Sequence, residues 1–243
     1  MNKPDTQNND SRWSGFYKVS GVAALMVVLV ALLDIVMAML SGEAKENSAI
    51  SVVEWYTLFQ NRPLSAFGNL GLFNIIYLAL AFPLYLALYH IHRRVHQAYA
   101  ALATLLFFVG TTVYFSTNTV FAVFALSRQY AAALTEAQKS LLIAAGQAAL
   151  AQGADLTPGV FMGFLFTEIA GILMAVVMLQ SGIFSKLTAW AGILALGCML
   201  IFNTLAAFLP ANFDVAMMFA ALGGPLSMAY YILIARRLFQ LGR

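Results

Sequence analysis

Two carboxylates stand inside strongly apolar runs of this chain, and their position makes them candidates for chemistry. Asp34 lies in ALLDIVMAML and Glu168 lies in FLFTEIAG. A charged side chain at the centre of a membrane helix costs at least about 2.5–3.5 kcal/mol, so such residues face the interior of a bundle or a water-filled cavity. The chemistry that a carboxylate offers there is to bind a cation or an amine, or to carry a proton.

Three asparagines are expected at nearly the same depth as the two acids. At about 1.5 Å of rise per residue, Asp34 lies about 10 Å and Glu168 about 13 Å below the outer end of its helix, and the amides lie about 8–12 Å deep. The three amides belong to Asn74, Asn118 and Asn203. These depths predict one polar layer that is displaced toward the outer surface.

This polar layer has two main explanations. The acids and amides can form a hydrogen-bonded clamp in which burial keeps at least one carboxyl protonated. Alternatively, they can line an outward-accessible pocket for a cation, an amine-bearing molecule or a lipid head group, and a proton relay is a third reading. A clamp needs only one or two polar pairs, so the number of polar groups is the reason for considering a pocket.

Only membrane-spanning helices can position these residues, because the chain is 62% hydrophobic and only 9% charged. An average soluble domain has about 25% charged residues. Six apolar runs have the length of a membrane-spanning helix. Their approximate bounds are Val19–Leu40, Leu70–Tyr89, Ala98–Leu126, Val160–Leu179, Leu187–Leu209 and Val215–Ala235. We predict an all-α fold with a polar cytoplasmic leader over residues 1–18 and a single six-helix membrane domain over residues 19–243.

The basic residues between the spans predict the orientation. One side carries Lys3, Arg12, Lys18, Arg93, Arg94, Lys186, Arg236, Arg237 and Arg243. The other side carries Lys45, Arg62, Arg128 and Lys139. Because basic residues accumulate on the cytoplasmic side, both termini are expected in the cytoplasm, with external loops at about 41–69 and 127–159.

Each long external loop contains a predicted amphipathic helix. In SVVEWYTLFQNRP, Ser51 and Glu54 form a capping box and Pro63 ends the helix. In TEAQKSLLIAAGQAALAQG, Thr135 and Gln138 repeat this pattern, and Gly153 is the expected end. These helices either pack on the outer surface or roof an outward-facing cavity.

Small residues indicate which way Glu168 points. Gly163, Thr167, Gly171 and Ala175 recur every four residues, a pattern that allows another helix to approach closely. Glu168 is adjacent to this stripe, so its side chain is expected to point into the bundle.

All three histidines lie in LYHIHRRVHQAY, at the cytoplasmic end of the second span. We predict that His92, Arg93, Arg94 and His96 anchor the chain to anionic lipid head groups. No predicted span contains a histidine or a lysine, which argues against a histidine-ligated haem and a retinal Schiff base. There is also no HExxH sequence and no glycine-rich phosphate loop.

The sequence therefore predicts no cofactor, no metal site and no catalytic residue. The scattered basic residues do not indicate a nucleic-acid partner. An enzyme is disfavoured, although Asp34 and Glu168 leave a two-carboxylate hydrolase formally open.

Two segments carry a resemblance to a known family. QYAAALTEAQKSLLIAAGQAALAQG and, farther on, VMLQSGIFSKLTAWAGILA resemble a bacterial membrane family catalogued as domain of unknown function 4386. The similarity extends over most of the chain, from GVAALM in the first span to the sixth span. The resemblance implies a six-helix protein of the bacterial inner membrane, and it implies no activity and no catalytic residues.

The leading functional hypothesis is a protein that binds or senses a small ligand. Asp34 and Glu168 would supply negative charge, and the three asparagines would orient the ligand. A small secondary transporter coupled to cations or protons is a rival hypothesis, because the same residues would serve it. A third hypothesis is an assembly or stability factor for another membrane complex, with no ligand at all. The lipid bilayer is a partner under each of these hypotheses.

Overall fold

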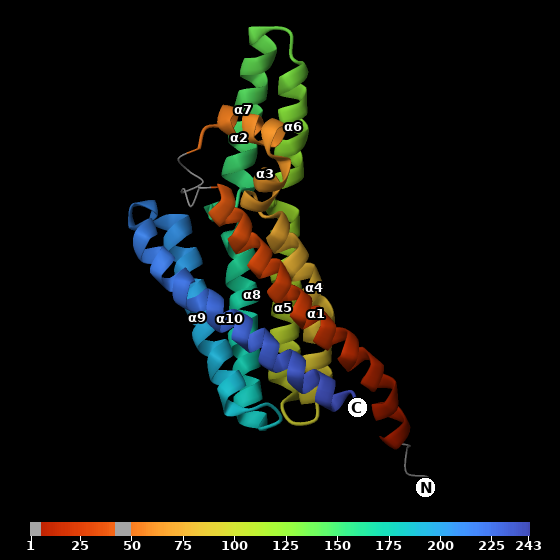
Figure 1. The fold of residues 1–243 in the computed structure, drawn as a ribbon. Coiled ribbons are helices and arrows are strands. Elements are labelled where there is room, and N and C mark those ends of the chain that lie inside the picture. The colour runs from red at the N-terminus through yellow and green to blue at the C-terminus, as the bar shows by residue number, and fades with distance from the viewer. Residues whose placement is uncertain (1–5, 42–49) are drawn as a thin grey trace.

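The structure is a computed structural model that describes residues 6–41 and 50–243, with side chains described for residues 13–37 and 50–243. Within these residues every regular element is a helix (Figure 1). Six segments are long and apolar enough to cross a membrane, which confirms the predicted all-α, six-span bundle. Residues 1–5 of the predicted leader and 42–49 of the first predicted loop lie outside the described residues.

Six long helices form a ring. They are α1 (Thr6–Ser41), α4 (Leu72–His92), α5 (Gln97–Thr117), α8 (Pro158–Ser181), α9 (Lys186–Phe208) and α10 (Phe213–Leu241). Each packs against two neighbours in this order, and α10 closes the ring on α1. Helices from all parts of the chain therefore surround one centre.

The two ends of the bundle differ. The first turns of α1 and the last turns of α10 lie together at what we call the terminal end, where the Ser14 hydroxyl donates a hydrogen bond to the Gly242 carbonyl at 2.8 Å. At the opposite end, α6 (Val120–Ala132) and α7 (Glu136–Gly153) extend beyond the ring as a helical hairpin (Figure 1). We call this the hairpin end.

Glycines let α8 approach two of its neighbours closely. A Cβ atom on Gly110 of α5 would lie 2.9 Å from the carbonyl oxygen of Gly163 on α8. A Cβ atom on Gly171 of α8 would collide with Leu196 of α9. The small-residue pattern of α8 thus marks close helix contacts, as the sequence predicted.

Two short helices brace the hairpin. They are α2 (Val52–Asn61) and α3 (Pro63–Asn69), and α2 packs against both α6 and α7. Trp55 and Tyr56 of α2 are buried there, and the Tyr56 hydroxyl donates to the Leu142 carbonyl at 2.6 Å. Burial, together with the neighbouring Tyr130, raises the pKa of Tyr56 above its usual value, so the hydroxyl stays protonated as a donor.

Both predicted capping boxes are present. Ser51 and Glu54 exchange side-chain and backbone hydrogen bonds at the start of α2, and Thr135 and Gln138 do so at the start of α7. Pro63 does more than end a helix, because it occupies the first turn of α3, where a missing backbone N–H costs nothing.

The third predicted span is interrupted. It was expected as one helix over Ala98–Leu126, but α5 ends at Thr117 and α6 begins at Val120. The side chain of Asn118 accepts a hydrogen bond from the Val120 amide at 3.1 Å, and the Thr119 hydroxyl donates to the Ala149 carbonyl at 2.7 Å. The first of these bonds is local and the second joins the break to α7, and together they accompany the interruption of the helix.

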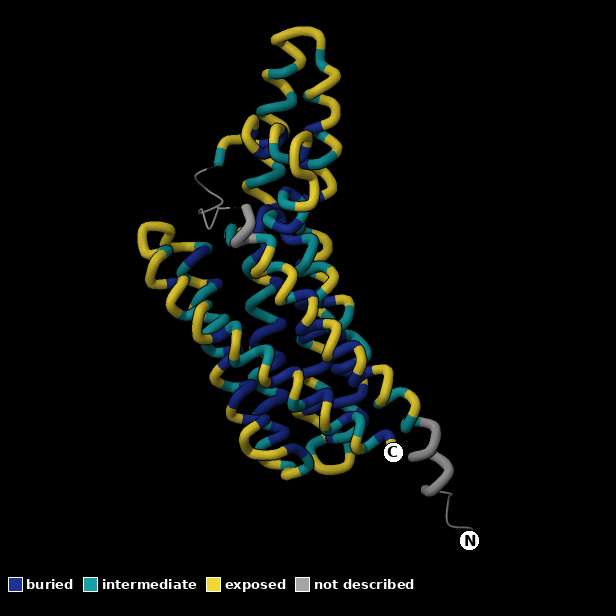
Figure 2. Tube along the Cα trace, in the orientation of Figure 1, coloured by how far each residue is buried: buried dark blue, intermediate teal, exposed yellow. Residues whose placement is uncertain are grey.

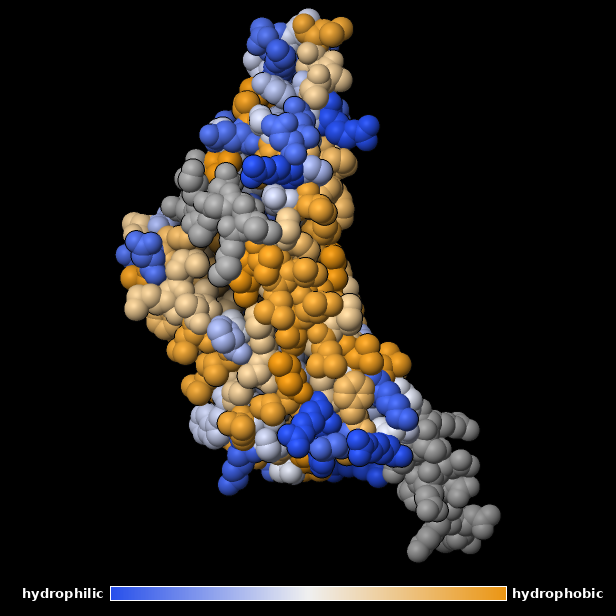
Figure 3. Space-filling model, viewed as in Figure 1, coloured by the Kyte–Doolittle hydropathy of each residue, from blue (hydrophilic) through white to orange (hydrophobic). Residues whose placement is uncertain are grey.

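The surface matches a membrane-spanning bundle. On the face shown in Figure 3, apolar side chains cover the ring, while hydrophilic residues gather at the hairpin and at the terminal end. The hairpin is mostly exposed, and the buried residues concentrate inside the ring and under α2 and α3 (Figure 2). The chain is therefore a multi-pass membrane protein in which α6 and α7 extend the polar end.

Candidate ligand-binding site

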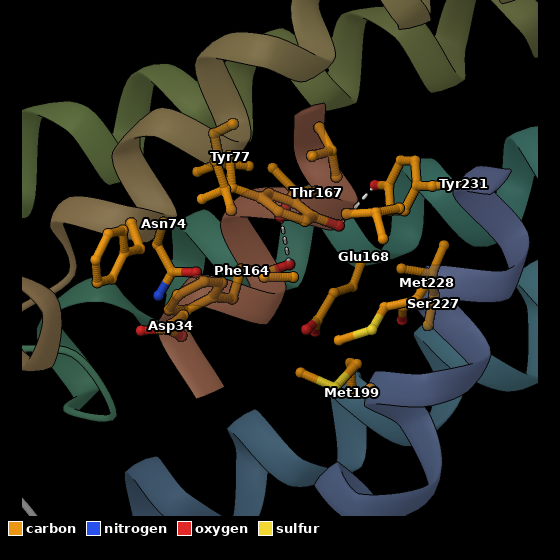
Figure 4. Close-up of a pocket in the computed structure, with 18 of the residues that line it drawn as sticks. Asp34, Asn74, Tyr77, Phe164, Thr167, Glu168, Met199, Ser227, Met228 and Tyr231 are labelled. Atoms are coloured by element: carbon orange, nitrogen blue, oxygen red, sulfur yellow. Dashed lines mark hydrogen bonds between the residues drawn. The ribbon is translucent and has the colours of Figure 1, made fainter. Parts of the chain in front are cut away.

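A cavity of about 290 Å³ lies inside the ring and is lined by residues from all six long helices. Its polar lining comes from Asp34, Asn74, Thr167, Glu168, Asn203 and Ser227. Aromatic and sulfur-containing side chains supply much of the remaining wall (Figure 4). The structure thus brings four of the five predicted ligand-binding residues to one cavity.

Glu168 is the most buried acid of the cavity, with a relative exposure of 5%. The Asn203 side-chain amide donates to its Oε1 atom at 2.5 Å. Its other oxygen, Oε2, is buried and has no hydrogen-bond partner within the described residues. An unsatisfied buried acceptor costs about 1–3 kcal/mol, and more when it is charged, so this oxygen is suited to receive a donor from a ligand.

Asp34 lines the cavity from α1 and is half-buried. Within the described part of the chain, its carboxylate has no hydrogen bond or ion pair. The side chains of Leu32, Leu33, Ile35 and Val36 around it are exposed on the apolar surface of α1. Asp34 is therefore the acid of α1 that faces the centre of the ring, as the sequence predicted.

Asn74 and Asn118 belong to a second polar cluster, which the sequence did not reveal. Its centre is Asp155, a buried residue between α7 and α8. Asp155 accepts hydrogen bonds from the Tyr114 hydroxyl at 2.5 Å and from the Asn74 amide at 2.7 Å. Asn118 donates to the Leu70 carbonyl at 2.9 Å and does not line the cavity.

The burial of Asp155, in a loop between two helices, was not predicted from the sequence. The turn that follows α7 directs it inward, and Leu156 adopts a left-handed backbone with φ 62°. The backbone of Gly71 (φ 98°) lies so close to the cluster that a Cβ atom there would collide with Tyr114, Asp155 and Asn118. The signal in the sequence was the pair of amides at Asn74 and Asn118, since buried amides require partners.

Aromatic residues form the deeper wall of the cavity. The Tyr77 hydroxyl donates to the Tyr231 hydroxyl at 2.7 Å, which ties α4 to α10. Tyr85 stacks on Phe107 at a centroid distance of 3.8 Å. Tyr85 lies about 16 Å farther along α4 than Asn74, so the aromatic wall is on the terminal side of the polar groups.

One family matches this chain. The sequence model described as "Domain of unknown function (DUF4386)" matches residues 63–235, well over half of the chain. The chain belongs to this family. No curated protein and no solved structure matches it significantly.

The DUF4386 match covers α3 to α9 and most of α10, and it therefore includes Asn74, Glu168 and Asn203. It begins at residue 63, later than the resemblance seen in the sequence, so α1 with Asp34 lies outside it. In this DUF4386 protein, α1 nevertheless completes the ring and supplies one of the two cavity acids.

The predicted head-group anchor requires a correction at His92. Its ring has no exposed surface, makes a hydrogen bond with the Leu88 carbonyl at 2.8 Å and stacks against Phe184. It therefore does not reach lipid head groups. Arg94 is exposed, whereas Arg93 and His96 are half-buried, and head-group anchoring by these three remains a prediction.

Proposed function

We propose that this protein binds a small cationic or amine-bearing molecule, or a lipid head group of that chemistry, in the cavity of the ring and acts as a binding or sensing protein. The observation that carries this proposal is the buried Oε2 atom of Glu168: the residue belongs to the cavity lining, and this atom has no hydrogen-bond partner within the described residues. A ligand that donates a hydrogen bond there would satisfy it.

The charge of the lining supports a cationic ligand. Two acids line the cavity, and the lining contains no lysine, arginine or histidine among the described residues. An anion would meet two carboxylates without a compensating charge, at a high cost in a low-dielectric site. A cation would be attracted to both.

We further propose a bacterial inner-membrane location with cytoplasmic termini. Arg93, Arg94, Lys186 and Arg236 lie near the terminal end, whereas Glu54, Glu136 and Asp214 lie near the hairpin end. The accumulation of basic residues at the terminal end supports this orientation. The polar end of the cavity would then face outward.

Ligand-dependent stability tests the proposal. The purified full-length protein in detergent would be heated with ethylamine, ethanolamine and phosphoethanolamine as probes. We expect at least one amine to raise the Tm of the wild type, because a ligand at 100 times its Kd stabilises the bound state by about 2.7 kcal/mol.

The matched variants are Glu168→Gln and Glu136→Gln. The glutamine at position 168 can still accept the hydrogen bond from Asn203, and it removes only the charge. Glu136 is exposed on the hairpin and makes an ion pair with Lys139, far from the cavity. We expect Glu168→Gln to abolish the Tm shift and Glu136→Gln to preserve it. A shift that survives in Glu168→Gln and in Asp34→Asn would overturn the proposal.

Counterflow of a bound amine in proteoliposomes separates the sensor from the rival transporter. A binding or sensing protein leaves the amine outside, whereas a transporter accumulates labelled amine in vesicles preloaded with unlabelled amine. Accumulation above empty vesicles would replace the sensing role by transport at the same site.

A further inference from the structure

The two acids of the cavity occupy different positions on its wall. Asp34 comes from α1 and Glu168 from α8, helices that are not neighbours in the ring. In Figure 4, the carboxylate of Asp34 lies on the side of Asn74, and that of Glu168 points toward Met199. The ring of Phe164 appears between them in this view. The cavity thus has two separate acceptor positions.

Each acceptor position has an atom available to a donor. At one, Asp34 has no hydrogen bond within the described residues, and the oxygen of the Asn74 amide is turned toward the cavity while its nitrogen donates to Asp155 (Figure 4). At the other, Oε2 of Glu168 is free of partners among the described residues, and Oε1 is held by Asn203.

The balance of charge favours a ligand with two positive groups. A single cation would neutralise one carboxylate and leave the other without a basic partner in the lining described here. Uncompensated charges in a low-dielectric site are costly, whereas two opposite charges with good hydrogen bonds offset that cost.

The wall between the two acids is apolar. Phe164 appears between the two acids in Figure 4, and Met199 and Met228 line the cavity beyond Glu168; none of these side chains can accept a strong hydrogen bond. A chain of methylene groups would bury its surface there at about 25 cal/mol per Å². The volume of about 290 Å³ is just below the range of about 300–1,000 Å³ that is usual for ligand pockets, so the cavity suits a small molecule better than a whole lipid.

We propose that the ligand is a linear diamine whose two ammonium groups bind Asp34 and Glu168, with its methylene chain against Phe164. This inference rests on the proposed function, because it takes the same cavity as a site for amines. It adds the number of cationic groups and their separation by an apolar chain.

The experiment compares matched amines on the full-length protein in lipid nanodiscs. Calorimetry would measure the Kd of pentylamine and of a diamine series from 1,3-diaminopropane to 1,8-diaminooctane. We expect the best diamine to bind at least tenfold more tightly than pentylamine. We also expect one optimal length, because the two carboxylates are fixed on different helices.

The variants Asp34→Asn and Glu168→Gln test the bridge. Each should reduce the preference for the best diamine over pentylamine to threefold or less, since only one acid remains. Asp214→Asn, on the exposed first turn of α10, removes a charge outside the cavity and should leave the preference unchanged. This control distinguishes a diamine that bridges the two acids of the cavity from a dication that is attracted by the overall negative charge of the protein.

The outcomes distinguish the two proposals. If pentylamine binds as tightly as every diamine, the diamine inference fails and the amine site stands. If affinity is independent of diamine length, or if Asp34→Asn leaves the preference intact, the bridge also fails. If neither the monoamine nor any diamine binds, both this inference and the proposed function fail.

Discussion

At the scale of single residues, the binding capacity of the cavity depends on the different hydrogen bonding of the two carboxylate oxygens of Glu168. Asn203 holds one oxygen of Glu168 and leaves the other, buried oxygen without a hydrogen-bond partner among the described residues. The amide fixes the side chain, and the free oxygen keeps a binding capacity that a complete clamp would have used. Glu168 therefore has features of both explanations of the polar layer: one oxygen is part of a clamp, and the other is available to a ligand.

The first prediction concerns this pair. Asn203→Leu removes the only described donor to Glu168, so both oxygens become unsatisfied, and we expect a loss of about 1–3 kcal/mol of stability. The double variant Glu168→Leu/Asn203→Leu replaces both polar partners and should be less destabilised than Asn203→Leu. Denaturant unfolding in detergent measures both. The single variant Glu168→Leu completes the cycle. If the double variant loses as much stability as Asn203→Leu and Glu168→Leu lose together, the pair is not coupled.

At the scale of the helices, the cluster around Asp155 joins three separate elements. It connects the start of α4 through Asn74, the end of α5 through Tyr114, and the α7–α8 turn. These hydrogen bonds thereby fix the hairpin to the ring near the break between α5 and α6. The hydrogen bond to Asp155 also occupies the nitrogen of the Asn74 amide, while Asn74 lines the cavity.

The second prediction tests this junction at Gly71. Gly71→Ala places a side chain at φ 98° and against Tyr114, Asp155 and Asn118. Its control, Gly182→Ala, has φ 66° but nothing within 4 Å of the new Cβ. Left-handed backbone alone costs an alanine about 1–2 kcal/mol, and forced packing adds about 1–3 kcal/mol. We expect Gly71→Ala to lower stability in the same unfolding assay by more than its control does.

Equal losses in the two glycine variants would mean that the junction tolerates displacement. Hydrogen exchange then identifies where the structure opens. We expect Gly71→Ala to increase exchange at the α5–α6 break and in the last turn of α7, while α9 and α10 keep their protection. Increased exchange confined to α9 and α10 would contradict the role of the cluster.

Local signals in the sequence were sufficient for some of these features. The capping boxes of α2 and α7 were predictable, because the residues that form each box are only three positions apart. The inward face of Glu168 followed from the adjacent small residues. The break at Asn118 and the burial of Asp155 were missed, since both depend on partners 30 or more positions away, such as Ala149 and Tyr114.

At the scale of the whole molecule, the ring creates the cavity. Hydropathy predicted six spans, because each apolar run is long enough to cross a membrane. It did not predict that α1 closes the ring between α4 and α10, which places Asp34 in the same cavity as Glu168. Asp34 and Glu168 can line one cavity only because they lie at similar depths in their helices. The order of the helices in the ring is the second condition.

The last prediction concerns the orientation of the molecule, which decides where a ligand enters. In a Cys198→Ser background, Ser140→Cys places a thiol on the exposed hairpin, and Gln97→Cys places one at the start of α5, near the terminal end. If the basic terminal end is cytoplasmic, a membrane-impermeant maleimide should label Ser140→Cys in intact spheroplasts and Gln97→Cys only after permeabilisation. The reverse pattern would turn the polar end of the cavity toward the cytoplasm, and an amine reaching Asp34 and Glu168 would then come from inside the cell.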